Sequence, residues 1–382
     1  MPIQANKPSE IDDDIPEGVD ETETIDPIGI LGDPYDPEKI RVERKTPSID
    51  IIAKRMEHGE INLAPDFQRN EVWTDEAKSR LIESILIRIP LPAFYVDATD
   101  EDYWLVVDGL QRLTAINKFV VEQSLRLRGL EFLEDFEGKT FDDLPRNLQR
   151  RILETELTIF LIQPGTPMQV KFNVFKRINT GGLPLSAQEI RNAINGPRVR
   201  EFILKMVGSV PFQRATKGKI GDKRMADREC ICRFFAFELT PPHEYKGKDL
   251  DSFINGAMAR LDDPQEFSDQ ALDALEQRFY RAMDRANAIF GKYAFRKYDG
   301  PNSRMNPISK ALFESVSHGL ARLTDDDAAY LIRQRESLMA AYAELMKEPD
   351  FRGSISQATG GASQVQRRFD KINELFQNFL TP

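Results

Sequence analysis

The chain has few of the residues that build disulfide scaffolds and metal centres. Its 382 residues include two cysteines, three histidines and two tryptophans. Cys230 and Cys232 stand two positions apart on an expected helix, where their side chains point in different directions. We therefore expect reduced structural thiols rather than a disulfide or a metal site.

Long apolar runs are also missing. No uninterrupted apolar stretch reaches the roughly 20 residues that span a membrane, and the first residues lack the basic and then apolar layout of a signal peptide. We therefore expect a cytoplasmic protein with no membrane partner. With 41% hydrophobic and 30% charged residues, the composition is that of an ordinary globular protein, and the length suggests about two to three domains.

Basic charge is scarce in one segment only. Residues 1–38 hold twelve acids and one base, a net charge of −11, so the remaining 344 residues carry about +1 of the total of −10. Several prolines accompany the acids, and this composition predicts a disordered acidic tail. The tail is either a solubilising extension or an arm that docks on a partner or imitates DNA. The neutral body neither requires nor excludes nucleic acid, because a local basic face decides that.

The pattern of secondary structure changes near residue 165. Before it, the periodicity predicts helices and strands in alternation, with helices at 49–56, after Thr74 and at 145–154, and strands at 61–63, 93–98, 103–107, 125–127 and 157–162. Beyond it, we expect helices alone, at 168–177, 187–194, 197–207, 225–239, 249–260, 265–291, 307–320, 326–346 and 363–379. The predicted fold class is α+β, with the tail at 1–38, a core domain at 39–165 and an all-helical domain at 166–382.

The most informative stretch runs from Val107 to Ala115. An apolar strand leads into Asp108 and Gly109, and a helical pattern begins almost at once. The first N–H groups of a helix have no internal partner and carry partial positive charge, so such a turn suits an anion. Arg112 adds a bidentate phosphate donor. The stretch predicts a phosphate-bearing ligand, although Asp108 also suits a helix N-cap and Gly109 also suits a plain turn.

Blocks of sequence on both sides of this stretch resemble a known family. They are Pro65-Asp66-Phe67-Gln68-Arg69, Ile89-Pro90-Leu91-Pro92, Val107-Asp108-Gly109-Leu110-Gln111-Arg112-Leu113-Thr114, Phe175-Lys176-Arg177-Ile178-Asn179-Thr180-Gly181-Gly182 and Glu189-Ile190-Arg191, with a weaker block at Asp227-Arg228-Glu229. In this order they resemble the N-terminal domain of GmrSD-type restriction endonucleases, in the ParB/sulfiredoxin-like group, over about residues 47–240. The resemblance implies a ParB-like α+β core that binds a nucleotide and serves in defence against foreign DNA.

The resemblance also implies a composite nucleotide site. Its residues would be Gln68, Arg69, Asp108, Gly109, Gln111, Arg112, Arg177 and Asn179. Asp108 and Arg112 would be the catalytic residues, with Asp108 holding Mg²⁺ against the phosphates of an NTP whose base the sequence does not identify. The ordinary alternatives are a solvated loop for Gln68 and Arg69, a surface salt bridge for Arg112 and a helix C-cap at 177–180.

Two departures from the family pattern limit this expectation. Leu110 stands where the family's Asp-Gly-Gln-Gln-Arg motif has its first glutamine. If that glutamine touches the nucleotide, hydrolysis is weakened here while binding survives; if it packs, nothing is lost. Full GmrSD enzymes also carry a histidine-metal nuclease domain, whereas His58, His243 and His318 lie in no such motif and are expected at surfaces or helix ends. We therefore do not expect this chain to cut DNA by itself.

A basic segment with glycines is a second candidate site. Its residues are Arg214, Lys217, Lys219, Lys223 and Arg224. Such a loop either contacts DNA phosphates without reading sequence or is simply solvated. Arg367, Arg368 and Lys371 are expected on a helix face.

These patterns predict a nucleotide-binding regulator of a prokaryotic anti-phage or restriction-type defence system, with or without Mg²⁺-dependent NTP hydrolysis. It would control the engagement of DNA or of a partner nuclease or effector. The alternative is a non-catalytic DNA-binding adaptor that keeps the fold without turnover. The oligomeric state stays open.

Overall fold

The chain forms two compact units in the computed structural model, which describes residues 19–20, 41–63, 73–100, 102–178, 185–220, 223–247, 249–301 and 305–380. The sheet unit comprises Pro34–Ile194, and the helical unit comprises Asn195–Pro382 with Met1–Asp33. The boundary expected near residue 165 is where the strands end, whereas two more helices pack with the sheet before the unit closes at Ile194. The predicted α+β fold class with a helical C-terminal part is confirmed.

A five-stranded mixed sheet forms the centre of the sheet unit. Its strands, in the order β1-β5-β3-β4-β2, are β1 (Val42–Lys45), β5 (Ile159–Ile162), β3 (Phe94–Asp97), β4 (Trp104–Asp108) and β2 (Ile61–Asn62). The predicted strands at 93–98 and 103–107 correspond to β3 and β4, which pair antiparallel as a hairpin, while β5 lies parallel to β3. The predicted strand at 125–127 is wrong. Leu125 and Leu127 are buried there, but they lie in irregular chain.

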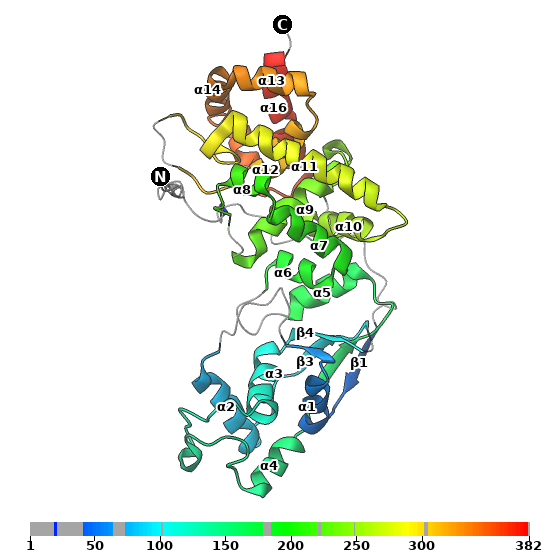
Figure 1. Ribbon diagram of the computed structural model, residues 1–382, viewed down its shortest axis with the longest axis vertical. Coiled ribbons are helices and arrows are strands. Elements are labelled where there is room, and N and C mark those ends of the chain that lie inside the picture. Colours follow the sequence, from blue (N-terminus) through cyan, green and yellow to red (C-terminus); the bar gives the residue numbers. More distant parts are fainter. Residues whose placement is uncertain are drawn as a thin grey trace, which may run out of the picture. The chain divides into compact units, whose positions relative to one another are not determined.

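Helices cover both faces of this sheet (Figure 1). The first set is α1 (Ile49–Glu57), α2 (Asp75–Leu86), α3 (Leu110–Ile116) and α4 (Arg146–Leu153), and the second set is α5 (Met168–Ile178) and α6 (Ala187–Ile194). The first set shares a core with Phe94 and Val106, and the second shares a smaller core with Val107 and Ile162. Val106 and Val107 thus point to opposite faces, as successive residues of a strand do.

Local capping fixes where two of these helices begin. Thr74 Oγ1 accepts a hydrogen bond of 3.3 Å from the N–H of Ala77 at the start of α2. At α6, Ser186 N–H donates to Glu189 Oε2 (2.6 Å) and Glu189 N–H donates to Ser186 Oγ (3.1 Å). This reciprocal pair is a capping box, so Glu189 has a structural role.

The helical unit is built around an aromatic core. Its helices are α7 (Pro197–Val207), α8 (Val210–Thr216), α9 (Ala226–Leu239), α10 (Leu250–Asp262), α11 (Asp269–Phe290), α12 (Lys310–Ala321), α13 (Asp325–Arg333), α14 (Arg335–Leu345), α15 (Pro349–Ser354) and α16 (Ala362–Leu380). The rings of Phe234 and Phe235 lie 5.2 and 5.8 Å from that of Phe279. The expected helix at 326–346 is two helices, α13 and α14, which meet at Gln334. Among the described residues, no helix is long and apolar enough to cross a membrane.

Two residues of the expected acidic tail belong to the described structure. Val19 and Asp20 are held on the helical unit by a backbone bridge and an ion pair, in contrast to the disorder expected from composition. The rest of that segment, 1–18 and 21–38, lies outside the described residues.

Candidate functional site

The turn between β4 and α3 is where the sequence placed the phosphate ligand. Asp108 is the last residue of β4, and Gly109 precedes α3 with φ of 100°. A β-carbon on Gly109 would lie 2.4 Å from Cδ1 of Phe94, so the position needs glycine for its backbone conformation and for space. Gly109 is itself the N-cap of α3, and Asp108 does not cap the helix.

The side chain of Asp108 instead pairs with Arg112. Nη2 of Arg112 donates to Asp108 Oδ2 (2.9 Å) and to the carbonyl of Ala93 (3.2 Å), and Nη1 donates to the carbonyl of Pro92. The guanidinium also stacks 4.4 Å above the ring of Phe94. Arg112 therefore braces the turn against the start of β3.

The side chains of Asp108 and Arg112 differ in their exposure to solvent. The side chain of Arg112 is 11% exposed, whereas that of Asp108 is 30% exposed. Burial lowers the pKa of Arg112, and the charge of Asp108 opposes that change. Asp108 is thus the member of the pair that faces solvent.

Leu110 and Gln111, which lie between Asp108 and Arg112 in the sequence, have different surroundings. Gln111 Oε1 accepts a hydrogen bond of 3.3 Å from the N–H of Trp73, which follows the segment containing Gln68 and Arg69. Both of those candidates lie outside the described residues. Leu110 is buried in the core shared with α1 and α2. Leu110, the residue that departs from the family motif, therefore packs in the core.

Helix α5 packs on the opposite face of β4. Phe172 and Phe175 share a cluster with Val107, the residue before Asp108. Arg177 is exposed two positions beyond Phe175, and Asn179 lies outside the described residues. The structure thus gathers four predicted residues, Asp108, Gly109, Gln111 and Arg112, in one turn.

A buried ion pair that the sequence did not indicate fixes α5 on the sheet. Nζ of Lys171 lies 3.0 Å from Asp97 Oδ2 and donates to Thr99 Oγ1. The pairing joins residues 74 positions apart, so no local motif could have revealed it.

The candidate DNA-contacting residues are not one continuous loop. Arg214 belongs to α8, Lys217 ends it, and Arg224 precedes α9. Arg214 pairs with Asp284 (3.6 Å) and Lys217 donates to Asn287 (2.8 Å), both on α11. Lys219 is partly buried, and the side chain of Lys223 lies outside the described residues.

The histidines differ from the expectation at one position. His58 ends α1 and is exposed, as is His243, but His318 is buried in α12. Its Nδ1 lies 3.0 Å from Glu238 Oε1, and Arg322 Nε donates to its Nε2 (2.9 Å). These partners make burial tolerable. In the described ranges, no three His, Cys, Asp or Glu side chains gather as a metal site.

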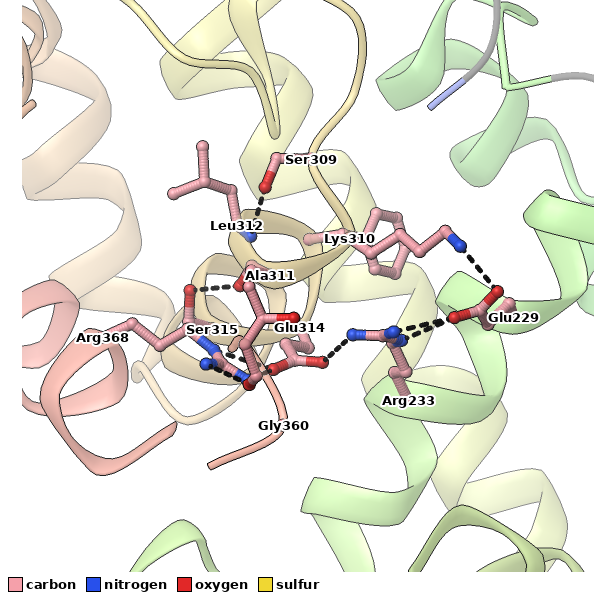
Figure 2. A network of polar contacts seen from close by, with 12 residues as sticks. Glu229, Arg233, Ser309, Lys310, Ala311, Leu312, Glu314, Ser315, Gly360 and Arg368 are labelled. Carbon is pink, nitrogen blue, oxygen red and sulfur yellow. Dashed lines mark hydrogen bonds and ion pairs between the residues drawn. The ribbon is translucent and has the colours of Figure 1, made fainter. Parts of the chain in front are cut away.

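A chain of buried charges joins three helices of the same unit (Figure 2). Arg233 of α9 donates to Glu229 (3.0 Å) and to Glu314 of α12 (3.2 Å), and Arg368 of α16 donates to Glu314 (2.8 Å). The expectation that Arg368 lies on a helix surface is wrong, because Glu314 gives it a buried partner. Glu229, from the weaker family block, serves this network and accepts from Lys310 (2.7 Å).

The fold is an α+β domain in which strand β4 leads through Asp108 and Gly109 into helix α3. Residues 51–195 match the family model of the GmrSD restriction endonuclease, N-terminal domain. The resemblance drawn from the sequence blocks is thereby confirmed for this segment, which ends one residue beyond the sheet unit. The match links the segment to a domain of restriction-type systems. No curated protein matches the chain.

Proposed function

We propose that this protein is a nucleotide-binding regulatory component of a restriction-type defence system and that the β4–α3 turn forms part of its nucleotide site. The carboxylate of Asp108 carries the proposal. Its Oδ2 is held by Arg112, while its Oδ1 has no partner within the described ranges and the side chain is partly exposed. Mg²⁺ takes one or two protein carboxylates and otherwise keeps water and phosphate oxygens. Asp108 fits that requirement, and the ion would neutralise phosphate charge.

In the proposed site, the backbone N–H groups and the side chains of the turn have different roles. The first hydrogen bond inside α3 runs from Leu113 N–H to the carbonyl of Gly109 (2.9 Å), so the N–H groups of residues 110–112 have no acceptor within the helix. These groups suit phosphate oxygens. Gly109 gives the turn its positive φ, and Arg112 positions Asp108. Gln68, Arg69, Gln111, Arg177 and Asn179 complete the proposed site.

Calorimetric titration with ATP, GTP, CTP and UTP, with and without Mg²⁺, tests this proposal. We expect at least one nucleotide to bind with Mg²⁺, and Asp108→Asn to weaken that binding by roughly ten-fold or more, the effect of about 1.4 kcal/mol. Asp100→Asn is the control, because it removes the same charge from the β3–β4 turn of the same sheet. If no nucleotide binds the unmodified protein, the proposal is wrong.

Nucleotide state would control the engagement of DNA or of a partner nuclease. The basic residues proposed for DNA contact are Arg214, Lys217, Lys219, Lys223 and Arg224. Contacts of this kind neutralise phosphates, so the logarithm of the affinity should fall linearly with the logarithm of salt concentration. A salt-independent affinity would argue against them.

The second candidate function, an adaptor without turnover, depends on Leu110. Because Leu110 is buried in the core, Leu110→Gln places an amide there and should lower the free energy of unfolding by about 1–3 kcal/mol. We expect no gain in phosphate release from this variant. A gain in phosphate release would show that residue 110 takes part in the reaction. Binding without phosphate release above an Arg112→Ala control would instead favour the adaptor.

A further inference from the structure

Two residues of the acidic N-terminal segment contact the helical unit through their backbone. Val19 forms a parallel bridge with Ile308, and the N–H of Asp20 donates to the carbonyl of Ile308 (2.7 Å). Ile308 also pairs antiparallel with Arg296. Ile308 thus forms two isolated β-bridges, one with Val19 and one with Arg296, within one unit.

Side chains reinforce this backbone pairing. Nζ of Lys297 lies 2.7 Å from Asp20 Oδ2, and the two side chains are 15% and 10% exposed. Val19 packs against the aromatic core of the helical unit. The pair thus supplies one apolar and one ionic contact, in addition to the main-chain hydrogen bond.

Internal hydrogen bonds fix the segments around residues 296 and 308, which contact Val19 and Asp20. The side chain of Arg296 is buried, and its Nη1 donates to the carbonyl of Asn306 (2.5 Å). The amide of Asn306 donates to the carbonyl of Lys297 (2.9 Å), and the hydroxyl of Tyr342 donates to the carbonyl of Arg296 (3.2 Å). A surface fixed in this way needs little reorganisation to receive an extended peptide.

We propose that Ile308 and Lys297 form a docking site for an extended acidic peptide, and that its occupant is the chain's own N-terminal segment. Backbone pairing provides the attachment, while Lys297 selects an acidic residue that follows an apolar one. The proposal is independent of nucleotide binding.

Docking ties residues 19 and 20 to the helical unit by a main-chain hydrogen bond and an ion pair. We call Val19 and Asp20, with their partners Ile308 and Lys297, the clasp. Because the ion pair is largely buried, salt should screen it only weakly.

Charge reversal in the full chain tests the clasp. Asp20→Lys and Lys297→Asp each oppose like charges, and the double variant restores an opposite pair. Hydrogen exchange at the Asp20 amide and proteolysis within residues 1–38 measure release. We expect each single variant to accelerate both by on the order of ten-fold, and the double variant to return towards the unmodified rates.

Asp12→Lys is the matched control, because it changes the charge of the same segment by the same amount outside the docked pair. Asp20 lies in a terminal segment, so its reversal tests docking without altering the core. The proposal is overturned if the Asp20 amide of the unmodified protein exchanges as fast as that of a free peptide. It is equally overturned if both single reversals behave like Asp12→Lys.

Discussion

At Gly109, backbone conformation and a neighbouring ring together leave room for hydrogen alone. Gly109→Ala places a β-carbon in the left-handed region and against Phe94, and we expect a loss of about 2–4 kcal/mol in the free energy of unfolding. Gly138→Ala is the control, since Gly138 also has positive φ but no atom within 4 Å of the added carbon. Urea unfolding should show the larger loss at Gly109. Equal losses would mean that Phe94 moves aside freely.

The same turn shows which single-residue roles the sequence can predict. Gly109 was predictable because a strand pattern and a helix pattern meet there. The acceptors of Arg112 were not, since Pro92 and Ala93 lie 20 and 19 residues away and come within reach only when β3 pairs with β4. The side-chain type alone suggested a phosphate donor, and pairing of the strands gives the guanidinium two main-chain acceptors in addition to the nearby carboxylate of Asp108.

Among the helices, α9 and α12 combine burial with charge. His318 and Glu238 face each other across them, and Arg322 and Arg278 add further charge, with Arg278 donating to Glu238 (3.0 Å). Burial lowers the pKa of His318, and Glu238 only partly opposes this. The Arg322 bond to Nε2 is consistent with the neutral ring, protonated on Nδ1.

This arrangement predicts acid lability of the helical unit. As pH falls below about 6.5, the unfolded histidine binds a proton before the folded one does, so stability falls. His318→Gln keeps a donor for Glu238 and an acceptor for Arg322 but cannot titrate. Unfolding measured from pH 7.5 to 5.5 should therefore show a steeper loss of stability for the unmodified protein. Equal slopes would show that His318 titrates alike in both states.

Elements with a strong local signal were predicted well, and elements defined by distant partners were not. Thr74 and the Ser186–Glu189 pair mark helix starts through contacts within three residues. The apolar residues at 125–127 suggested a strand, yet Leu125 N–H donates to the carbonyl of Lys118 and Leu127 N–H to that of Lys139, so no continuous strand ladder forms there. Arg368 looked like a surface residue because its partner Glu314 lies 54 positions away.

Across the whole molecule, each unit has its own hydrophobic core. Phe119 belongs to the core of the sheet unit and Phe279 to that of the helical unit, and both are fully buried. The sequence placed the boundary at 165 because the strands end there. It could not show that α5 and α6 pack on the sheet, since Lys171, Phe172 and Phe175 acquire their partners only in three dimensions.

Separate cores predict separate unfolding transitions. Phe119→Ala and Phe279→Ala should each cost about 3–5 kcal/mol, because each leaves a cavity in a packed core. Scanning calorimetry should resolve two transitions, with Phe119→Ala lowering one and Phe279→Ala lowering the other. The transition lowered by Phe279→Ala should also be the one that acidification lowers in a His318-dependent way, since both residues belong to the helical unit. A single transition lowered equally by both substitutions would show that the two units unfold together.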